Sequence, residues 1–526
     1  MRDFQLPGRS TVYASSGMCA TSHPLASATA VDILKSGGNA VDAAIAAAVL
    51  LGICEPHMTG LGGDCFALIQ PAPGEDIVAL NASGRAPIRA SPDALRAAGH
   101  AVMPRDTAAA VTVPGAVDGF CALSERFGRL GLAAALAPAI RYAEEGLPVA
   151  PRAAADWARF ANRLQGPARD AYLVDGRAPA PGTLFRAIGQ ADVLRRISKD
   201  GRDAFYTGEV ADDMRSALRD APHSEADFAA TACTWGTPIS GRYGDWEVLE
   251  HPPNGAGTAA LLLLDILSEF DLASLDPLGT DRVHLEAEAT KLAYDARNRF
   301  VADFDHMPDP ARLQRPGLGK SLAALIDPAT SIDKIAPRTE EVHKHTICLT
   351  VVDKDRMVVS LIYSIFDDFG SGIASPKFGI LLHNRGSGFN LIPGHANEYG
   401  PGKRPMHTIL PGMVRRGGEV TMPFCVMGGP YQATGHARLI TNLVAYGMEL
   451  QDALDAPRAF ADIAQGKLFI ERGYGRDVWE GLAARGQAVV EAPGPIGGAQ
   501  AIRMDVIDGV LVGASDPRKD GIALGY

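Results

Sequence analysis

The sequence predicts an α+β protein, with helices dominating its first part and strands its last part. Apolar residues recur at helical spacing in several long segments before residue 304. The pattern changes abruptly at Thr346, where short β-branched apolar runs begin. The 57 glycines in 526 residues supply many tight turns. Because the chain exceeds the size at which single cores stop growing, we expect several domains or one large layered domain.

The first elements form a helical pair followed by strands. Residues 25–35 have the pattern of an amphipathic helix, which Ser36-Gly37-Gly38 ends because glycine adopts the left-handed conformation without strain. Asn39 caps a second, alanine-rich helix at 40–51, which we expect to be buried. After the glycine loop 59–64, short buried strands are predicted at 66–70 and 77–81.

The middle of the chain is predicted to be helical at 116–127, 132–144, 258–272 and 281–303. Residues 312–343 lose this pattern and are rich in proline and charge, so we expect an exposed tail. Strands at 347–352 and 357–365 then form a hairpin around the turn 353–356, and a further helix is predicted at 437–446.

Composition excludes several classes of protein. The net charge is −11, the pI is about 5.7 and no Lys/Arg run stands out, so we expect no nucleic-acid or anionic membrane partner. The longest apolar stretch, 43–54, is too short to span a bilayer, and no signal peptide is evident, so we expect a cytoplasmic protein. The seven cysteines form no C-x-x-C pair and are predicted to be reduced and mostly buried.

Thr346 is the candidate nucleophile, because it opens a buried strand directly after an irregular segment. A threonine at the start of a chain can use its own α-amine as the base, and this amine has a pKa of about 8. Such a residue must be freed by cleavage of a precursor. On this pattern alone, an ordinary threonine at the start of a core strand remains the alternative.

Motifs spread along the chain resemble those of the γ-glutamyltransferase (glutathione hydrolase) family, in the family's order. They lie at 17–27, 37–44, 59–63, 284–294, 346–353 and 428–429. This resemblance implies the four-layer αββα sandwich of the N-terminal-nucleophile hydrolases. It also implies self-cleavage between His345 and Thr346. The products would be a large subunit, 1–345, and a small subunit, 346–526, that stay together as a heterodimer.

The same resemblance implies roles for individual residues. Thr346 would be the nucleophile, and the amides of Gly428 and Gly429 would form the oxyanion hole. Ser364 matches a position where the family has a threonine hydroxyl near the nucleophile. This chemistry requires no cofactor or metal. His343 and His345 are two residues apart but have no cluster of further ligands, so we do not expect them to bind a metal.

The chain departs from the family at the positions that bind glutamate. Ser83 stands where the family has its carboxylate-binding arginine, and Gly388 where it has the aspartate for the substrate ammonium. Phe366 replaces an asparagine, Arg385 replaces a glutamine, and His407-Thr408 replace paired serines. The pattern Gly84-Arg85-Ala86-Pro87 with Asn384-Arg385-Gly386 resembles a divergent branch of the family that includes oxamate amidohydrolase and related acylases.

We therefore predict a small anionic amide as the substrate. Arg385, His407 and Thr408 are the candidate binding residues, together with Arg85, which lies two positions after Ser83 and would face the same side of a strand. Two alternatives remain. One is an ordinary γ-glutamyltransferase with rearranged glutamate contacts. The other is an unprocessed, catalytically silent binding protein, because Ile347-Cys348-Leu349 differ from the family's residues after the nucleophile.

Overall fold

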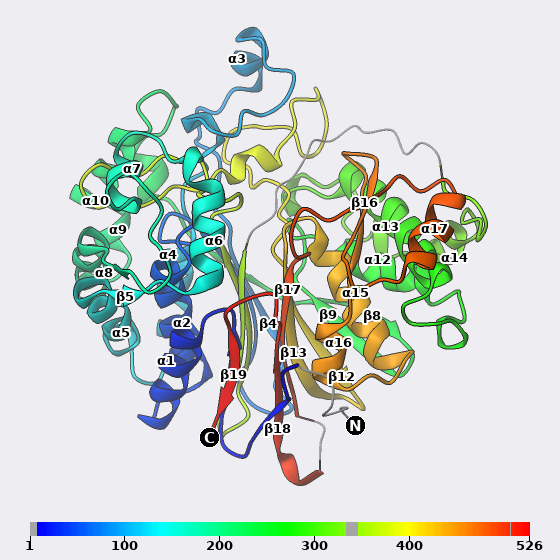
Figure 1. The fold of residues 1–526 in the computed structure, drawn as a ribbon. Helices are drawn as coiled ribbons and strands as arrows, with labels where there is room; N and C mark the ends of the chain where they lie inside the picture. Colours follow the sequence, from blue (N-terminus) through cyan, green and yellow to red (C-terminus); the bar gives the residue numbers. More distant parts are fainter. Residues whose placement is uncertain (1–7, 333–345, 505–506) are drawn as a thin grey trace.

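Two seven-stranded antiparallel sheets stack face to face and carry helices on their outer faces (Figure 1). The computed structural model describes residues 8–332, 346–504 and 507–526. Buried side chains from both sheets, including Leu68, Val352, Met413 and Ile502, meet between them. The Ser360 hydroxyl also donates across the interface to the Phe424 carbonyl, at 2.8 Å. The four-layer αββα prediction is therefore confirmed.

The first sheet, called here the β13 sheet, has seven strands in spatial order. They are β1 (Val12–Ala14), β18 (Leu511–Ser515), β17 (Gly498–Arg503), β13 (Glu419–Met427), β12 (Pro411–Arg416), β9 (Trp246–Glu250) and β8 (Ile239–Tyr243). The second, the β10 sheet, comprises β19 (Ile522–Gly525), β2 (Met18–Thr21), β10 (Ile347–Val352), β11 (Val358–Ser364), β3 (Asp64–Gln70), β4 (Val78–Ala82) and β7 (Thr234–Gly236).

Both sheets combine strands from before and after Thr346. In the β10 sheet, β10 lies between β2 and β11, so the strand that follows Thr346 is central. In the β13 sheet, β1, β8 and β9 flank four strands from the C-terminal part. A chain cut before Thr346 would therefore remain joined by backbone hydrogen bonds in both sheets.

One helical layer covers the β10 sheet, and the other covers the β13 sheet. The first contains α1 (Pro24–Lys35), α2 (Ala40–Cys54), α4 (Ala116–Phe127), α5 (Leu132–Glu145) and α8 (Ile188–Asp200). The second contains α12 (Gly257–Leu267), α13 (Thr280–Phe300), α14 (Leu318–Ala323), α15 (Tyr431–Val444), α16 (Leu450–Asp455) and α17 (Arg476–Ala484).

The remaining elements are short or lie at the edges of these layers. The helices are α3 (Pro92–Ala97), α6 (Pro151–Phe160), α7 (Pro167–Tyr172), α9 (Asp203–Tyr206), α10 (Gly208–Ala217) and α11 (Glu225–Ala229). The strands are β5 (Leu147–Pro148), β6 (Leu184–Phe185), β14 (Ala459–Asp462), β15 (Lys467–Ile470) and β16 (Val489–Glu491).

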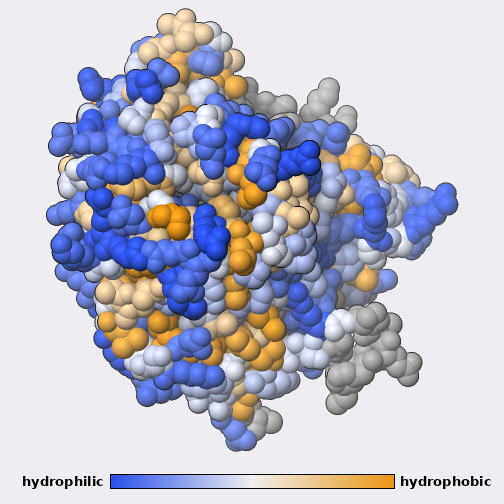
Figure 2. All heavy atoms as spheres, turned by 60° about the vertical axis from the view of Figure 1, so that its left-hand side comes forward, coloured by the Kyte–Doolittle hydropathy of each residue, from blue (hydrophilic) through white to orange (hydrophobic). Residues whose placement is uncertain are grey.

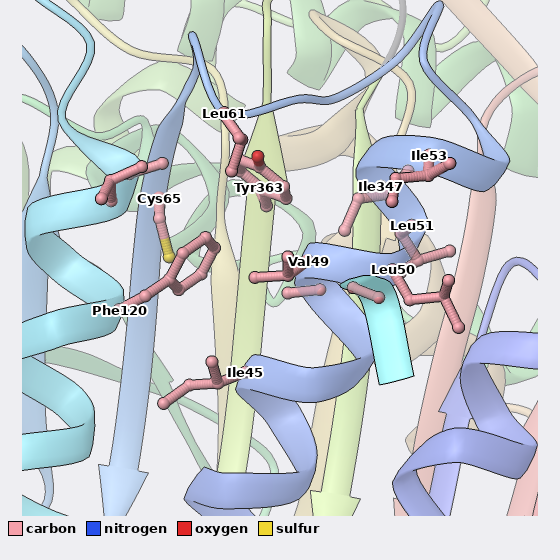
Figure 3. Packing of buried hydrophobic residues seen from close by; sticks show 14 of the residues in the cluster. Ile45, Val49, Leu50, Leu51, Ile53, Leu61, Cys65, Phe120, Ile347 and Tyr363 are labelled. Atoms are coloured by element: carbon pink, nitrogen blue, oxygen red, sulfur yellow. The ribbon is translucent and has the colours of Figure 1, made fainter. Parts of the chain in front are cut away.

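Helix α2 fixes the position of the strand that follows Thr346. Every residue of this helix is buried, as its alanine-rich sequence predicts. Figure 3 shows Ile347 and Tyr363, on the neighbouring strands β10 and β11, packed against apolar side chains of α2. Asn39 caps the helix in a reciprocal capping box with Asp42, which confirms the predicted start.

The predicted elements are confirmed with shifted ends. The expected exposed tail is confirmed only in part, because most of its described residues are exposed but several are buried. The part of the expected exposed tail that the structure describes, residues 312–332, is ordered against the α12 helix. Leu313, Ala323 and Ile326 are buried in the same core as α12, so their apolar side chains outweigh the surrounding proline and charge. Residues 333–345, including His343 and His345, lie outside the described residues.

The outer surface is largely polar on the face that carries the helices at the left of Figure 1. Figure 2 shows hydrophilic residues over most of this face and hydrophobic residues in small, separate groups. Scattered groups of this kind are usual on folded proteins. Within residues 8–332, 346–504 and 507–526, no helix is long and apolar enough to cross a membrane. All seven cysteines are free thiols, and five of them are buried.

Candidate active site

Thr346 lies immediately before β10 and is almost completely buried, with 1% of its surface exposed. Its Oγ1 is 3.2 Å from the Oγ of Ser364, the last residue of the neighbouring strand β11. The Gln432 side-chain amide donates to the same Thr346 oxygen, at 3.5 Å. The antiparallel pairing of β10 with β11 brings the two hydroxyl residues together, although they are 18 positions apart in the sequence.

The hydroxyl of Ser364 is held by a tight turn and by a buried arginine. Its Oγ accepts a hydrogen bond from the Phe366 amide at 2.8 Å, and Phe366 has a φ of 79°, unusual for a residue with a side chain. The Arg385 guanidinium donates to the same oxygen at 3.4 Å and lies 4.1 Å from the Phe366 ring centre. The position of Ser364 is therefore fixed from two sides.

Gly428 and Gly429 form the connection between β13 and α15. Gly428 has a φ of 129°, and a Cβ at this position would lie 2.8 Å from the Cα of Gly497, so the site requires glycine. The segment lies at the N-terminus of α15, where backbone N–H groups favour negative charge. This placement suits an oxyanion hole, the role predicted for the two glycines.

A cavity of about 350 Å³ connects these groups, within the usual range for small-molecule sites. Thr346 and Gly428 both line it. Its other walls are mainly apolar, from Met58, Phe160, Met427, Tyr431, Phe460, Phe469, Pro493, Pro495 and Ile496. Charged side chains on the lining are the four cations Arg152, Arg159, Lys467 and Lys519 and the single carboxylate Asp368. The lining is therefore biased towards an anion.

A separate charged cluster lies behind Ser364, and its centre is the fully buried Asp64. The Asp64 carboxylate contacts His383 Nδ1 at 3.0 Å, His407 Nε2 at 3.3 Å and Arg385 Nε at 3.6 Å, and accepts from the Gly84 amide at 2.8 Å. Burial opposes ionisation of Asp64, but the charge and hydrogen bond of His383 and the hydrogen bond of His407 outweigh it and hold its pKa below the usual range.

Arg385 and His407 are equally buried in this cluster. Desolvation lowers the pKa of Arg385 to about 9, against the opposing effects of Asp64 and Asp367. Burial and the neighbouring Arg385 charge lower the pKa of His407 to about 3, so this imidazole is neutral near pH 7. Arg385 also donates to Thr408 Oγ1 at 3.3 Å. Three of the candidate substrate-binding residues, Arg385, His407 and Thr408, are thus brought together beside Ser364.

Comparison with known proteins identifies the family of this chain. A family model described as gamma-glutamyltranspeptidase matches residues 26–526. The chain belongs to this family. It is 34% identical to the glutathione hydrolase-like YwrD proenzyme of Bacillus subtilis, over 98% of this chain and 99% of that protein. It is also 34% identical to the oxamate amidohydrolase proenzyme of Klebsiella pneumoniae, over 97% and 98% of the respective chains.

Among solved structures, the fold matches cephalosporin acylase from Bacillus halodurans with a TM-score of 0.91 and 36% identity. The match covers 100% of this chain and 99% of that one. The chain is therefore an enzyme of the γ-glutamyltranspeptidase family, whose relatives include both hydrolases of glutathione type and amidohydrolases or acylases.

Within this family fold, Arg85 lies apart from the other candidate site residues. Its guanidinium pairs with Asp303 at 3.3 Å and donates to the Gly402 carbonyl at 2.9 Å, and 40% of its side chain is exposed. Arg85, Arg385, His407 and Thr408 are all absent from the described lining of the cavity that Thr346 reaches. Their role in substrate binding stays a prediction.

The cations that do line this cavity were not predicted from the sequence. Arg152 and Arg159 come from α6, Lys467 from β15 and Lys519 from the loop between β18 and β19. Nothing in the local sequence links these segments, and α6 lies about 300 residues before the other two. The one available signal is the dense run of charge Asp516-Pro517-Arg518-Lys519-Asp520, in a chain end that is otherwise apolar.

Proposed function

We propose that this protein is a self-processed amide hydrolase with Thr346 as its N-terminal nucleophile. The main observation behind this proposal is that Thr346 Oγ1 lies 3.2 Å from Ser364 Oγ and that Thr346 and Gly428 line the same cavity. The relatives named as proenzymes support processing of a precursor. On this proposal, residues 1–345 and 346–526 are the two subunits of one heterodimer, joined through strands of both sheets.

The first reaction is cleavage of the peptide bond between His345 and Thr346. The Thr346 hydroxyl attacks the His345 carbonyl carbon, and the C–N bond breaks to leave an ester and a free α-amine. Water then hydrolyses the ester to release the His345 carboxylate and restore the hydroxyl. The new α-amine has an unperturbed pKa of about 8, which suits a general base near neutral pH.

Turnover then uses the same hydroxyl on a substrate amide. The α-amine takes the hydroxyl proton as Oγ1 attacks the carbonyl, and the amides of Gly428 and Gly429 stabilise the oxyanion. Each such donor contributes about 3–4 kcal/mol to the transition state. The proton passes to the leaving amine, an acyl-threonine ester remains, and water hydrolyses it. Ser364 supports the oxygen of Thr346 throughout, because the Phe366 amide and Arg385 fix its position.

We infer a small amide that carries a negative charge as the substrate. The lining holds four cationic side chains against one carboxylate, Asp368. Carboxylates are the groups that arginine and lysine bind most readily in such sites. The similarity to an oxamate amidohydrolase agrees with this inference, because oxamate is a small amide with a carboxylate.

The decisive experiment is a denaturing gel of the purified protein, with N-terminal sequencing of any smaller chain. We expect two chains, the smaller beginning Thr-Ile-Cys-Leu. Thr346→Ala should remain a single chain without turnover, and Thr346→Ser should retain part of both reactions. Turnover by Thr346→Ala would exclude Thr346 as the nucleophile.

The same preparation separates the two alternatives. Rapid cleavage of γ-glutamyl-p-nitroanilide, with no action on oxamate-type amides, would identify an ordinary γ-glutamyltransferase. A wild-type chain that stays intact on prolonged incubation would instead indicate a catalytically silent homologue.

A further inference from the structure

Lys519 is a buried cation whose charge its neighbours neutralise only in part. Its side chain is 3% exposed, yet it lines the cavity that Thr346 reaches. Its Nζ contacts the Met58 sulfur at 3.6 Å. Among the residues described, its closest carboxylate oxygen is Oδ2 of Asp156, at 3.9 Å, beyond hydrogen-bond distance.

That carboxylate is already engaged by a stronger partner. Asp156 Oδ2 accepts from Arg152 Nε at 2.7 Å, and His57 Nε2 lies 3.8 Å from the same oxygen. Arg152 and Lys519 therefore share one buried carboxylate. Glu55 and Asp368 face the Lys519 ammonium from farther away. Burial, and then the Arg152 charge, lower the pKa of Lys519, which agrees with an ammonium short of a partner.

The loop that carries Lys519 is held rigidly. Asp516 pairs with Arg458, and Arg518 with Glu471. The Asp520 carboxylate accepts from the backbone amides of Arg152 and Ala153, each at 3.0 Å, and so caps the first turn of α6. Lys519 and α6 are thereby fixed relative to each other. A buried charge held in this way is pre-organised to bind an anion without rearrangement.

The cavity that Lys519 lines also has apolar walls, and two of its other cations are exposed. Phe460 and Phe469 are buried in the lining, whereas Arg159 and Lys467 are exposed. A ligand that reaches Lys519 must therefore place an anionic group in the interior and an apolar part against the walls. A carboxylate on a short apolar chain has this character, and an uncharged amide does not.

We propose that Lys519 binds the carboxylate of the substrate, so that the enzyme selects amides with a short apolar segment between the amide and a carboxylate. This inference rests on the proposed function and adds to it the binding residue and the substrate class. Lys519 acts by binding and not by proton transfer, so its loss should affect KM for carboxylate substrates and leave turnover of neutral amides intact.

The test compares matched amides with and without the carboxylate. One pair is the mono-p-nitroanilide of succinic acid and its methyl ester, with the charge on the acyl side. The other is N-acetyl-4-aminobenzoate and its methyl ester, with the charge on the amine side. We expect wild type to prefer the carboxylate in at least one pair, by about 10- to 100-fold in kcat/KM.

Lys519→Met should remove this preference through KM while keeping the activity on the neutral esters, and Lys519→Arg should restore part of it. Lys199→Met is the matched control, because it removes the same charge from an exposed position in the last turn of α8. Equal loss on carboxylate and neutral amides with Lys519→Met would assign a catalytic role instead and overturn the inference. So would a wild-type enzyme without preference in either pair.

Two readouts keep this test separate from the proposed function. A denaturing gel reports whether each variant is processed. If no amide is hydrolysed at all, the proposed function fails, and calorimetric titration of succinamate into wild type and Lys519→Met then judges the site alone. Binding that weakens at least tenfold in the variant supports the inference, and equal binding or none refutes it.

Discussion

Replacing Ser364 by alanine tests whether it supports Thr346, the proposed nucleophile. The substitution removes the oxygen that lies 3.2 Å from Thr346 Oγ1 and leaves the Phe366 amide and one Arg385 donor without this acceptor. In the resting state Thr346 Oγ1 donates to Ser364 Oγ. Once this proton has passed to the α-amine, the attacking oxygen carries more charge and accepts from the Ser364 hydroxyl instead. A hydrogen bond to a charged group contributes about 1.5–3 kcal/mol, which corresponds to about 10- to 150-fold in rate.

We therefore expect Ser364→Ala to lower kcat/KM by about 10- to 150-fold and to slow self-cleavage, with a smaller change in KM. The assay is steady-state hydrolysis of the best amide, together with a time course of precursor cleavage on a gel. Ser364→Thr, which keeps a hydroxyl at this position, should retain most of the activity.

Ser360→Ala is the matched control for a loss of stability. Ser360 is fully buried on the same strand as Ser364, and its hydroxyl donates to the Phe424 carbonyl at 2.8 Å. It pairs with Thr350 of β10 and so lies away from Thr346. Both alanine variants should lose about 1–3 kcal/mol of stability by leaving a buried polar group unpaired. Only Ser364→Ala should lose rate. Wild-type kcat/KM in a folded, processed Ser364→Ala enzyme would refute the reasoning.

Two further predictions concern the groups on either side of the nucleophile. Asp64→Asn should lower the free energy of unfolding by about 3–5 kcal/mol at pH 7, because the buried Arg385 loses its counter-charge. Because the folded state lowers the pKa of Asp64, the stabilisation by its carboxylate is complete above the unfolded-state pKa of about 3.9 and is lost as the pH falls below that value. The urea midpoints of wild type and Asp64→Asn should therefore converge in acid. A difference that stays constant with pH would show that the Asp64 charge is not the source of the stabilisation. Gly428→Ala should lower kcat by about 10²- to 10³-fold, because its Cβ would lie 2.8 Å from the Gly497 Cα and displace the backbone amide of residue 428. Gly494→Ala is the control and should leave kcat unchanged, because a Cβ in this part of the cavity wall would meet only the flexible Arg159 side chain.

Local patterns predicted most of the scaffold because the relevant interactions are local. The capping box at Asn39 and Asp42, the all-buried helix α2 and the β10–β11 hairpin each depend on neighbouring residues, and the structure places all three close to the predicted bounds. The buried positions in the otherwise exposed tail at 312–332 could not be predicted, because Leu313 and Ile326 obtain their burial from α12, a distant segment. Proline and charge in the sequence do not show such contacts.

The residues of the candidate site also fall into two groups, those that the sequence predicts and those that only the fold brings together. Thr346, Ser364 and the two glycines are predicted from their match to family positions at strand ends, and the sheets bring Thr346 and Ser364 together. The cations of the cavity come from α6, β15 and the β18–β19 loop, so only the fold places them on one wall. For that reason the sequence assigned the anion preference to Arg85 and Arg385, whereas the cavity lining presents Lys519 and Arg152.

Arg385 connects the support of the nucleophile with the choice of substrate. Its guanidinium is fully buried, contacts Asp64, Thr408 and Ser364 and lies against the Phe366 ring, so its side chain occupies the space beside Ser364. A substrate ammonium placed beside Ser364 would be repelled by the Arg385 guanidinium and would lose its hydration. Asp64 could not compensate for this, because its carboxylate already contacts Arg385 and two histidines. The residues that hold Ser364 in place therefore disfavour an α-amino group on that side of Thr346. On the proposed function, the substrate binds through the cavity that Thr346 and Gly428 line, where four cationic side chains against the single carboxylate Asp368 favour a carboxylate-bearing amide over a γ-glutamyl zwitterion.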